Sequence, residues 1–281
     1  MNLEKLLDEL RFPNAVRDAV RKWIGGNEKQ IGDIVEKAYD SDGLDFPLCG
    51  YESLTRLAAV TSLLLQKYGE YRSKGVSERI IFDTFRDISL RADFFYRKTG
   101  RTGISEEDVI WFRHIMNVNI FKLGVLQFQP FQMLYLDEEI MGEPYMIFSR
   151  ISRDILPEGA PVINCHIQRG TDLRAEAVGH SLKEAENFFA GYFPEIRFRG
   201  FLCYSWLLYP PMVERLPEDS NIRRFAGRFS VIGGCADAEQ ALENLFGEGK
   251  ILYQDATSLQ KMAMEAPELF GYACGFRKIL C

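Results

Sequence analysis

The first third of the chain carries apolar residues at helical spacing. Leucines recur every three or four positions across residues 3–10, until Pro13 interrupts the pattern. The same spacing predicts further helices, over 15–24, 30–39, 53–71 and 77–100. Ser105 and Asp108 are typical of a capped helix start just after them. Residues 1–115 are therefore expected to form a helical N-terminal domain.

The period of the pattern changes after residue 116. Polar and apolar residues alternate over 117–131 around Gly124, as two antiparallel strands would. Further strands are predicted over 133–136, 145–148, 162–167, 201–208, 229–232 and 271–280, with helices between the later ones. This order implies a mixed sheet flanked by helices. We therefore expect an α+β protein whose second domain covers residues 116–281.

Composition and charge exclude several classes of function. A net charge of −6 argues against a protein that follows nucleic-acid phosphates. No apolar run reaches the roughly 18 residues of a membrane helix, and residues 1–12 lack the pattern of a signal peptide. The six cysteines include no CxxC pair, which argues against a metal site or a disulfide framework. A cytoplasmic protein with reduced thiols is expected, and its oligomeric state is not indicated.

Candidate chemistry surrounds the strand predicted at 162–167. This strand brings His166 to its C-terminal end, where open α/β sheets usually bind ligands. Downstream, Ser181 and Glu184 match a capping box and predict a helix start that can hold a phosphate. The turn that leads into this start makes Val178, Gly179, His180 and Ser181 candidate residues of a phosphate site. The alternative is one surface helix that runs through Ser181.

Four motifs follow one another in this second half. They are HIQ at 166–168, SL…FF at 181–189, CYSWLL at 203–208 and DSNI at 219–222. In this order they resemble the GNAT-like C-terminal domain of a bacterial acyltransferase family. The upstream stretches FDTFRDISLRADFFYRKTG and IFKLGVLQF resemble the helical N-terminal domain of the same family. The resemblance implies acyl-CoA as cosubstrate and a small amine as acceptor.

The resemblance also implies where CoA binds. The pyrophosphate pattern of the GNAT superfamily, Q/R-x-x-G-x-G/A, has its nearest match at 174–179, which makes Arg174 and Gly179 candidate ligands. Ala177 stands at the first glycine position, and the match lies further from the strand than usual. CoA thioesters are thus expected where the strand ending at His166 meets the turn over 177–181.

Two further positions come from the superfamily pattern. A backbone N–H near Cys165 and Ile167 is implied as the donor to the oxyanion. The pattern N..A..LYeK.GF is matched from Asn221 onward, which makes Asn221 a candidate residue of the CoA site. This match puts Phe225 where a tyrosine often acts as general acid. Because a phenyl ring cannot donate a proton, another group would protonate the leaving thiolate.

Three side chains are candidates for the chemistry itself. His166 can act as a base near neutral pH, or it can be a structural imidazole that supports the next loop. Cys203 and Ser205 share one face of the following strand. If that strand lies beside the one ending at His166, Cys203 could approach the imidazole and form an acyl-enzyme. The alternative is that Cys203 is a small buried apolar residue.

Three functions are therefore compatible with the sequence. The first is a GNAT-like N-acyltransferase that moves an acyl group directly from CoA to an amine, with His166 as base. The second is an acyl-CoA sensor without catalysis, consistent with Phe225 and the imperfect pyrophosphate pattern. The third is a Cys–His thioesterase or transferase. Direct transfer needs only positioning, an oxyanion donor and a base, so we expect it in preference to an intermediate on Cys203.

Overall fold

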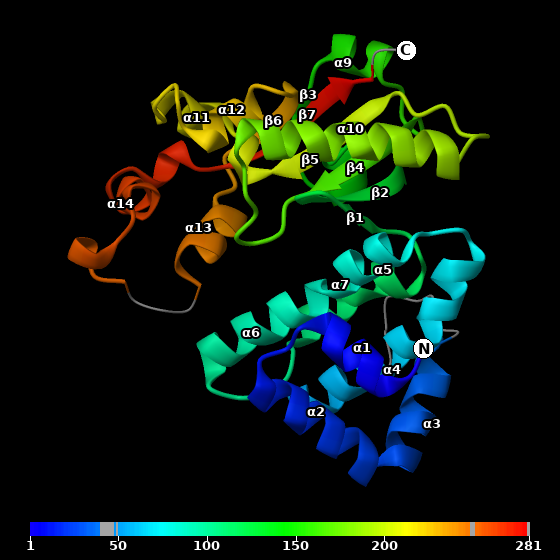
Figure 1. Cartoon of the computed structure of the whole chain (residues 1–281). Coiled ribbons are helices and arrows are strands. Elements are labelled where there is room, and N and C mark those ends of the chain that lie inside the picture. The colour runs from blue at the N-terminus through cyan, green and yellow to red at the C-terminus, as the bar shows by residue number, and fades with distance from the viewer. Residues whose placement is uncertain (40–47, 49, 248–250, 280–281) are drawn as a thin grey trace. The chain divides into compact units, whose positions relative to one another are not determined.

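The computed structural model describes residues 1–39, 48, 50–247 and 251–279 (Figure 1). The chain divides into two compact units, Met1–Lys122 and Leu123–Cys281. Among the described residues, no helix combines the length and the apolar character that crossing a membrane requires.

The first unit is built from helices, as the spacing of its apolar residues predicts. They are α1 (Leu3–Leu10), α2 (Asn14–Gly26), α3 (Glu28–Tyr39), α4 (Ser53–Ser73), α5 (Glu78–Phe85), α6 (Asp87–Thr99) and α7 (Glu106–Met116). Leu57, Ala58, Ala59 and Val60 follow one another in α4 and are all fully buried. A helix buried all round lies at the centre of its unit: α1, α2, α3, α5 and α7 contact α4, and α6 packs against α5.

Two details of this unit test the expected helix boundaries. The capping box of Ser105 and Asp108 is confirmed at the start of α7. The single helix expected over 77–100 is wrong, because the chain breaks at Arg86 into α5 and α6. At this break Arg86 donates from Nε to the carbonyl of Glu9 at 2.8 Å and from Nη2 to the Glu9 carboxylate at 2.9 Å. The break thus coincides with a tertiary contact to α1 that local spacing does not reveal.

The strands of the second unit, together with β1 at the boundary between the units, form a mixed sheet with the strand order β1-β2-β4-β5-β7-β6-β3. The strands are β1 (Phe121–Leu123), β2 (Leu126–Gln132), β3 (Ile147–Phe148), β4 (Pro161–His166), β5 (Gly200–Ser205), β6 (Ser230–Cys235) and β7 (Tyr272–Lys278). β4 and β5 pair in parallel, whereas the other pairs with a recorded register are antiparallel. The α+β class and the mixed sheet are confirmed.

Two expected strands differ from the structure. No strand covers 133–136, because Met133 makes its backbone hydrogen bonds to Gly159 and Ala160 in a loop. The strand expected over 201–208 ends at Ser205 and continues as the 3-10 turn η1 (Trp206–Leu208). The predicted hairpin around Gly124 is present, and Gly124 adopts a positive φ of 63° there.

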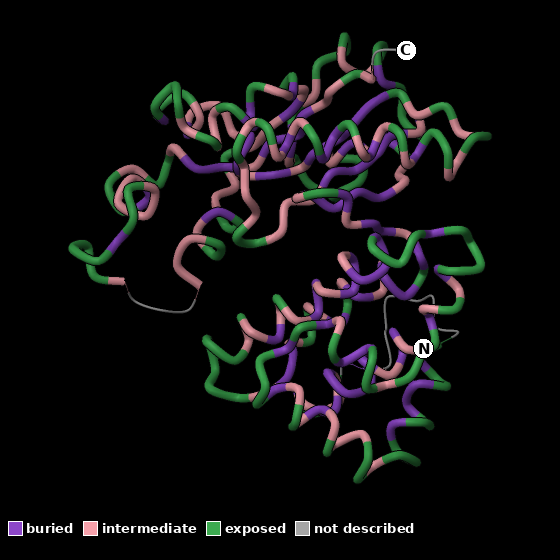
Figure 2. The backbone as a smooth tube through the Cα atoms, viewed as in Figure 1, coloured by how far each residue is buried: buried purple, intermediate pink, exposed green. Residues whose placement is uncertain are grey.

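Helices and short turns complete the second unit. They are α8 (Glu138–Met141), α9 (Arg150–Ile155), α10 (Ala175–Tyr192), α11 (Pro210–Arg215), α12 (Asn221–Ala226), α13 (Glu239–Phe246), η2 (Tyr253–Asp255), α14 (Ser258–Glu265) and η3 (Pro267–Leu269). Figure 1 shows α10 running across the strands, and its buried residues include Val178, Leu182, Ala185 and Phe189. The central strands are buried along most of their length (Figure 2).

The helix α10 is tied to the hairpin between β1 and β2. The fully buried Ser181 hydroxyl donates to the carbonyl of Leu123 and accepts from the N–H of Leu126 at 3.1 Å. A Cβ on Gly124 would come within 3.0 Å of the Ser181 Cβ, so the turn needs glycine both for its φ and for this approach. Ser181 therefore lies in the middle of a continuous helix, and the expected helix start at Ser181 is wrong.

Candidate active site

The parallel pairing of β4 with β5 is short. It covers Ile163 opposite Phe201 and Asn164 opposite Leu202. By contrast, β4 pairs with β2 as far as His166, and β5 pairs with β7 as far as Ser205. The ladder between the two parallel strands thus ends before their carboxyl ends. Open α/β sheets bind ligands at such carboxyl ends, so this place is the natural candidate for the site.

The two faces of the sheet differ here. Gln127 lies opposite His166, and Gln129 lies opposite Asn164. Because side chains alternate along a strand, these four residues share one face. Cys165 lies on the other face, where the register of β4 and β5 also puts Cys203. We call the first the histidine face and the second the thiol face.

His166 is held by a carboxamide of the neighbouring strand. Its Nε2 lies 3.1 Å from Oε1 of Gln129. An amide oxygen only accepts hydrogen bonds, so the proton of the neutral imidazole is on Nε2 and the lone pair is on Nδ1. A histidine with a fixed tautomer and a half-buried ring can serve as a base through Nδ1.

The thiol of Cys203 is closed off. Its side chain is fully buried, and it forms a hydrogen bond with Cys165. This hydrogen bond, together with burial, raises the pKa of Cys203 well above its usual value. The strand β5 does lie beside β4, but the structure does not bring Cys203 and His166 together because they occupy opposite faces. The geometry thus favours the apolar interpretation of Cys203 over an acyl-enzyme.

Ser205 has a local structural contact. It is buried at the end of β5, and its hydroxyl accepts from the N–H of Leu207 at 3.2 Å. This bond caps the turn η1. Ser205 shares the face of Cys203, as predicted from the alternation.

The start of α10 lies earlier than the expected phosphate loop. Arg174 is the N-cap residue, and the N–H of Val178 already bonds to the carbonyl of Arg174 at 3.0 Å. The first-turn N–H groups outside the helical ladder are therefore those of Ala175, Glu176 and Ala177. The predicted turn before a helix start at Ser181 is wrong, because residues 178–181 all lie inside the helix.

The remaining predicted CoA residues lie around this helix start. Arg174 forms a fork with the carboxylate of Asp172, with Nη2 to Oδ2 at 2.6 Å. His180 is exposed, and its Nδ1 lies 4.0 Å from Oε2 of Glu184. Asn221 is exposed at the first position of α12. Ile167 directly follows β4, beside the end of the short ladder.

An arginine outside the predicted CoA residues lies against the same helix. Arg228 donates from Nη2 to the carbonyl of Ala175 at 2.6 Å, and a Cβ on Gly179 would lie 3.6 Å from this nitrogen. Burial lowers the pKa of Arg228, and the charge of Arg277 lowers it further. A cation is thus held beside the positive end of the α10 dipole, which is an arrangement that an anion would stabilise.

The general-acid position is apolar, as its sequence suggests. Phe225 is buried in α12, with its ring 5.4 Å from that of Phe229. It cannot protonate a thiolate.

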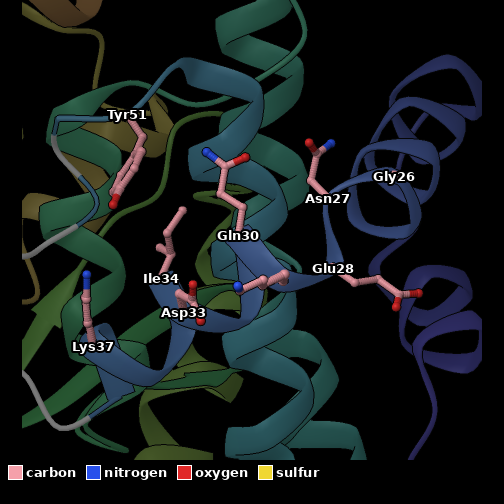
Figure 3. A pocket seen from close by; sticks show the side chains of 9 residues that line it. Gly26, Asn27, Glu28, Gln30, Asp33, Ile34, Lys37 and Tyr51 are labelled. Atoms are coloured by element: carbon pink, nitrogen blue, oxygen red, sulfur yellow. The ribbon is translucent and has the colours of Figure 1, made fainter.

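A separate cavity of about 520 Å³ lies in the helical unit. Figure 3 shows its lining side chains, which come from the end of α2, from α3 and from Tyr51. None of the predicted site residues lines it. It therefore carries no functional argument.

Comparison with known protein families agrees with this architecture. The family model of the GNAT-like C-terminal domain matches residues 120–269, and that of the N-acyltransferase N-terminal domain matches residues 1–118. The chain belongs to the GNAT-like family. No protein with a curated description matches the chain at a significant level.

Solved structures similar to this GNAT-like protein are acyltransferases. One, in complex with decanoyl-CoA, has a TM-score of 0.75 at 19% identity and covers 99% of this chain and 87% of its own. A second, in complex with decanoyl-CoA and teicoplanin, has a TM-score of 0.72 at 19% identity with the same coverage. A mutant in complex with octanoyl-CoA has a TM-score of 0.72 at 18% identity, again with that coverage. At this identity the likeness shows the fold.

The carboxamides of Gln127 and Gln129 were not among the site residues predicted from the sequence. Gln127 and Gln129 alternate with apolar residues in β2, a pattern that is visible in the sequence LQFQPFQ. The pattern does not say which strand β2 pairs with, so the sequence alone could not put them beside His166. In the described part of the chain, no three histidine, cysteine, aspartate or glutamate residues gather as metal ligands would.

Proposed function

We propose that this GNAT-like protein is an acyl-CoA-dependent N-acyltransferase that works by direct transfer. The observation that carries the proposal is the place of His166, at the end of the short β4–β5 ladder with its Nε2 3.1 Å from Oε1 of Gln129. The acceptor is an amine on a small molecule or peptide. Similar structures in complex with decanoyl-CoA or octanoyl-CoA support a CoA thioester as donor.

Free thiols at Cys165, Cys203, Cys235 and Cys274 agree with the cytoplasm as the location of the protein.

CoA is assigned to the start of α10. Its diphosphate would accept hydrogen bonds from the N–H groups of Ala175, Glu176 and Ala177, with the guanidinium of Arg228 close by. The pantetheine would follow the edge of β4 beyond Asn164, where pairing with β5 has ended. The thioester carbonyl would then meet the backbone N–H groups near Cys165 and Ile167, which act as the oxyanion donor.

The chemistry is a single displacement in which protons balance. The amine nitrogen forms a bond to the thioester carbon while Nδ1 of His166 takes one of its protons. The tetrahedral intermediate collapses, the carbon–sulfur bond breaks, and the CoA thiolate takes up a proton to give the free thiol and an amide. Because Phe225 cannot supply that proton, the imidazolium of His166 is the nearest assigned source. The reaction then needs no acyl-enzyme.

The second candidate is a sensor that binds acyl-CoA without turnover. The observation in its favour is Phe225, which is buried where the superfamily often has a tyrosine that acts as general acid. The Cys–His alternative has less support, because the Cys203 thiol is buried and its pKa is raised.

Binding and turnover separate these candidates. Isothermal titration calorimetry with CoA and octanoyl-CoA measures binding, and release of free CoA thiol in the presence of a panel of amines measures transfer. We expect binding followed by amine-dependent release. Binding without release across the panel supports the sensor. Absence of binding contradicts the proposal.

A matched pair of variants tests the assigned place of the phosphates. Arg228→Gln should weaken CoA binding by about tenfold, as expected for one charge-assisted hydrogen bond of about 1.5 kcal/mol. Arg224→Gln removes the same charge from an exposed position of α12 and should leave binding unchanged. Equal affinities for the two folded variants would place the phosphates elsewhere.

A further inference from the structure

The histidine face of the sheet contains buried carboxamides. Gln127 is 0% exposed, Gln129 is 5% exposed and Asn164 is 9% exposed. Gln127 lies opposite His166 and diagonally across from Asn164 in the antiparallel pair of β2 and β4. The carboxamide pair, defined as Gln127 and Asn164, therefore lies on the same face as the imidazole that is proposed as the base.

Part of this pair lacks hydrogen-bond partners. Neither Nε2 nor Oε1 of Gln127 has one among the described residues, and the same holds for Oδ1 of Asn164. An unpaired buried polar group costs about 1–3 kcal/mol, so folded proteins rarely keep such groups without a reason. Gln129 differs, because its Oε1 accepts from His166. Only Gln127 and Asn164 of the three carboxamides thus have unpaired groups, and both lie on the face of the sheet that carries the proposed base, His166.

The face changes from apolar to polar along β4. Phe131 lies opposite Val162, and both belong to the apolar cluster that includes Met133, Tyr135 and Leu202. The next pairs on this face, Gln129 with Asn164 and Gln127 with His166, are polar. This change occurs where the β4–β5 ladder ends. The unpaired carboxamides therefore lie where the acceptor must approach the thioester.

We propose that the carboxamide pair is the binding site for the acceptor, and that the acceptor carries a neutral hydrogen-bonding group next to its amine. This inference rests on the proposed function. One amine proton points to Nδ1 of His166, and the other is donated to Oδ1 of Asn164. The lone pair then faces the thioester carbon. The two ends of the Gln127 amide bind a neighbouring group that both donates and accepts, either a hydroxyl or an amide.

The uncharged nature of the pair supports this class of acceptor. A carboxylate at either position would hold the amine in its protonated form, because an opposite charge favours the charged state. Protonated amines have no lone pair for attack. Carboxamides accept the same hydrogen bonds without stabilising the ammonium, so the proton can pass to His166.

The test compares three amines in the full-length protein, with octanoyl-CoA as donor. Glycinamide and 2-aminoethanol carry the amide and the hydroxyl, whereas propylamine carries neither. The variant Gln127→Met keeps the length of the side chain and removes both hydrogen-bonding ends. Gln132→Met is the matched control, since Gln132 is exposed on the same strand. Octanoyl-CoA binding is measured separately by calorimetry.

We expect the wild-type protein to prefer glycinamide or 2-aminoethanol over propylamine in kcat/KM. This preference should fall about tenfold in Gln127→Met, as expected for the loss of one to two hydrogen bonds. Differences in amine basicity cancel because the ratio is compared between proteins. The Tm of Gln127→Met should equal or exceed that of the wild type, because unpaired groups are no longer buried. Gln132→Met should change neither quantity.

The outcomes separate this inference from the proposed function. A wild-type protein that binds octanoyl-CoA but shows no preference for the two polar amines overturns the inference and leaves the donor assignment intact. A Gln127→Met variant with a lower Tm and an unchanged preference also overturns it, because the amide is then structural. Absence of octanoyl-CoA binding overturns the proposed function, and the inference falls with it.

Discussion

The histidine face and the thiol face are built from neighbouring residues of one strand, yet they offer different chemistry. Cys165 points to the thiol face, where it forms a hydrogen bond with Cys203. His166 points to the histidine face, among the carboxamides of β2 and β4. The first side is apolar and closed, whereas the second contains buried groups that lack partners.

A shift of one residue along a strand moves a side chain to the opposite face of the sheet, and so can separate a nucleophile from a base. Cys203 and His166 are both reactive residue types, and β4 and β5 are neighbours. A covalent route needs both groups on one side, with a thiol of lowered pKa. The register of the two strands opposes the first requirement, and the raised pKa of Cys203 opposes the second.

The largest expected effect is on catalysis through the histidine face. His166→Ala should reduce kcat by about 10²–10⁴, the usual contribution of a general base. CoA affinity should change little, because the phosphates are assigned to α10. Cys203→Ala is the matched variant on the thiol face and should keep kcat within a few fold. Steady-state kinetics measures both. A stable acyl adduct on Cys203, seen by intact-mass spectrometry without acceptor, would reverse the comparison.

The next effect concerns the contact between the helix α10 and the β1–β2 hairpin. Ser181→Ala removes a hydroxyl that both donates to Leu123 and accepts from Leu126 in a fully buried place. The free energy of unfolding should fall by about 1–3 kcal/mol, because backbone groups are left unpaired. Urea denaturation measures the change, with the exposed Ser230→Ala as control. Lower CoA affinity at unchanged stability would instead restore Ser181 to the phosphate site.

A third effect concerns the chemical reactivity of the Cys203 thiol. Because Cys203 is fully buried and its pKa is raised, iodoacetamide at pH 8 should not modify it in the folded protein. Peptide mapping by mass spectrometry identifies the modified cysteines, and the urea-unfolded protein shows that Cys203 reacts once it is exposed. Rapid labelling of Cys203 in the native state would mean that the thiol face is open.

The smallest expected effect is on the pH dependence of stability, through His114. Burial lowers the pKa of His114, and the charge of Arg113 lowers it further. The folded state then disfavours the protonated form, so this group stabilises the protein above the unfolded pKa of about 6.5. That contribution is lost as the pH falls below this value and through the lower pKa of the folded state. His114→Gln should flatten the fall of Tm between pH 7 and 5. An unchanged slope contradicts this origin.

The sequence predicted the parts of the molecule that depend on local spacing. Apart from the break at Arg86, the helices of the first unit are found, as are the hairpin at Gly124 and the strand that ends at His166. The helix start at Ser181 was wrong because the serine bonds to a hairpin more than fifty residues away, which no local pattern records. The pairing of β2 with β4 is equally non-local, so the carboxamides beside His166 were missed. The catalytic and CoA-binding roles and the domain boundary at 115/116 remain predictions.

The position of β7 in the strand order has a consequence for synthesis on the ribosome. It is the last strand along the sequence, yet it lies inside the sheet, paired with β5 on one side and β6 on the other. Until residues 272–278 have left the exit tunnel, both of these strands present unpaired edges to other nascent chains. Elongation at about 5–20 residues per second keeps those edges exposed for several seconds. The second unit is thus expected to depend on chaperones more than the helical unit, which closes through contacts nearer in sequence.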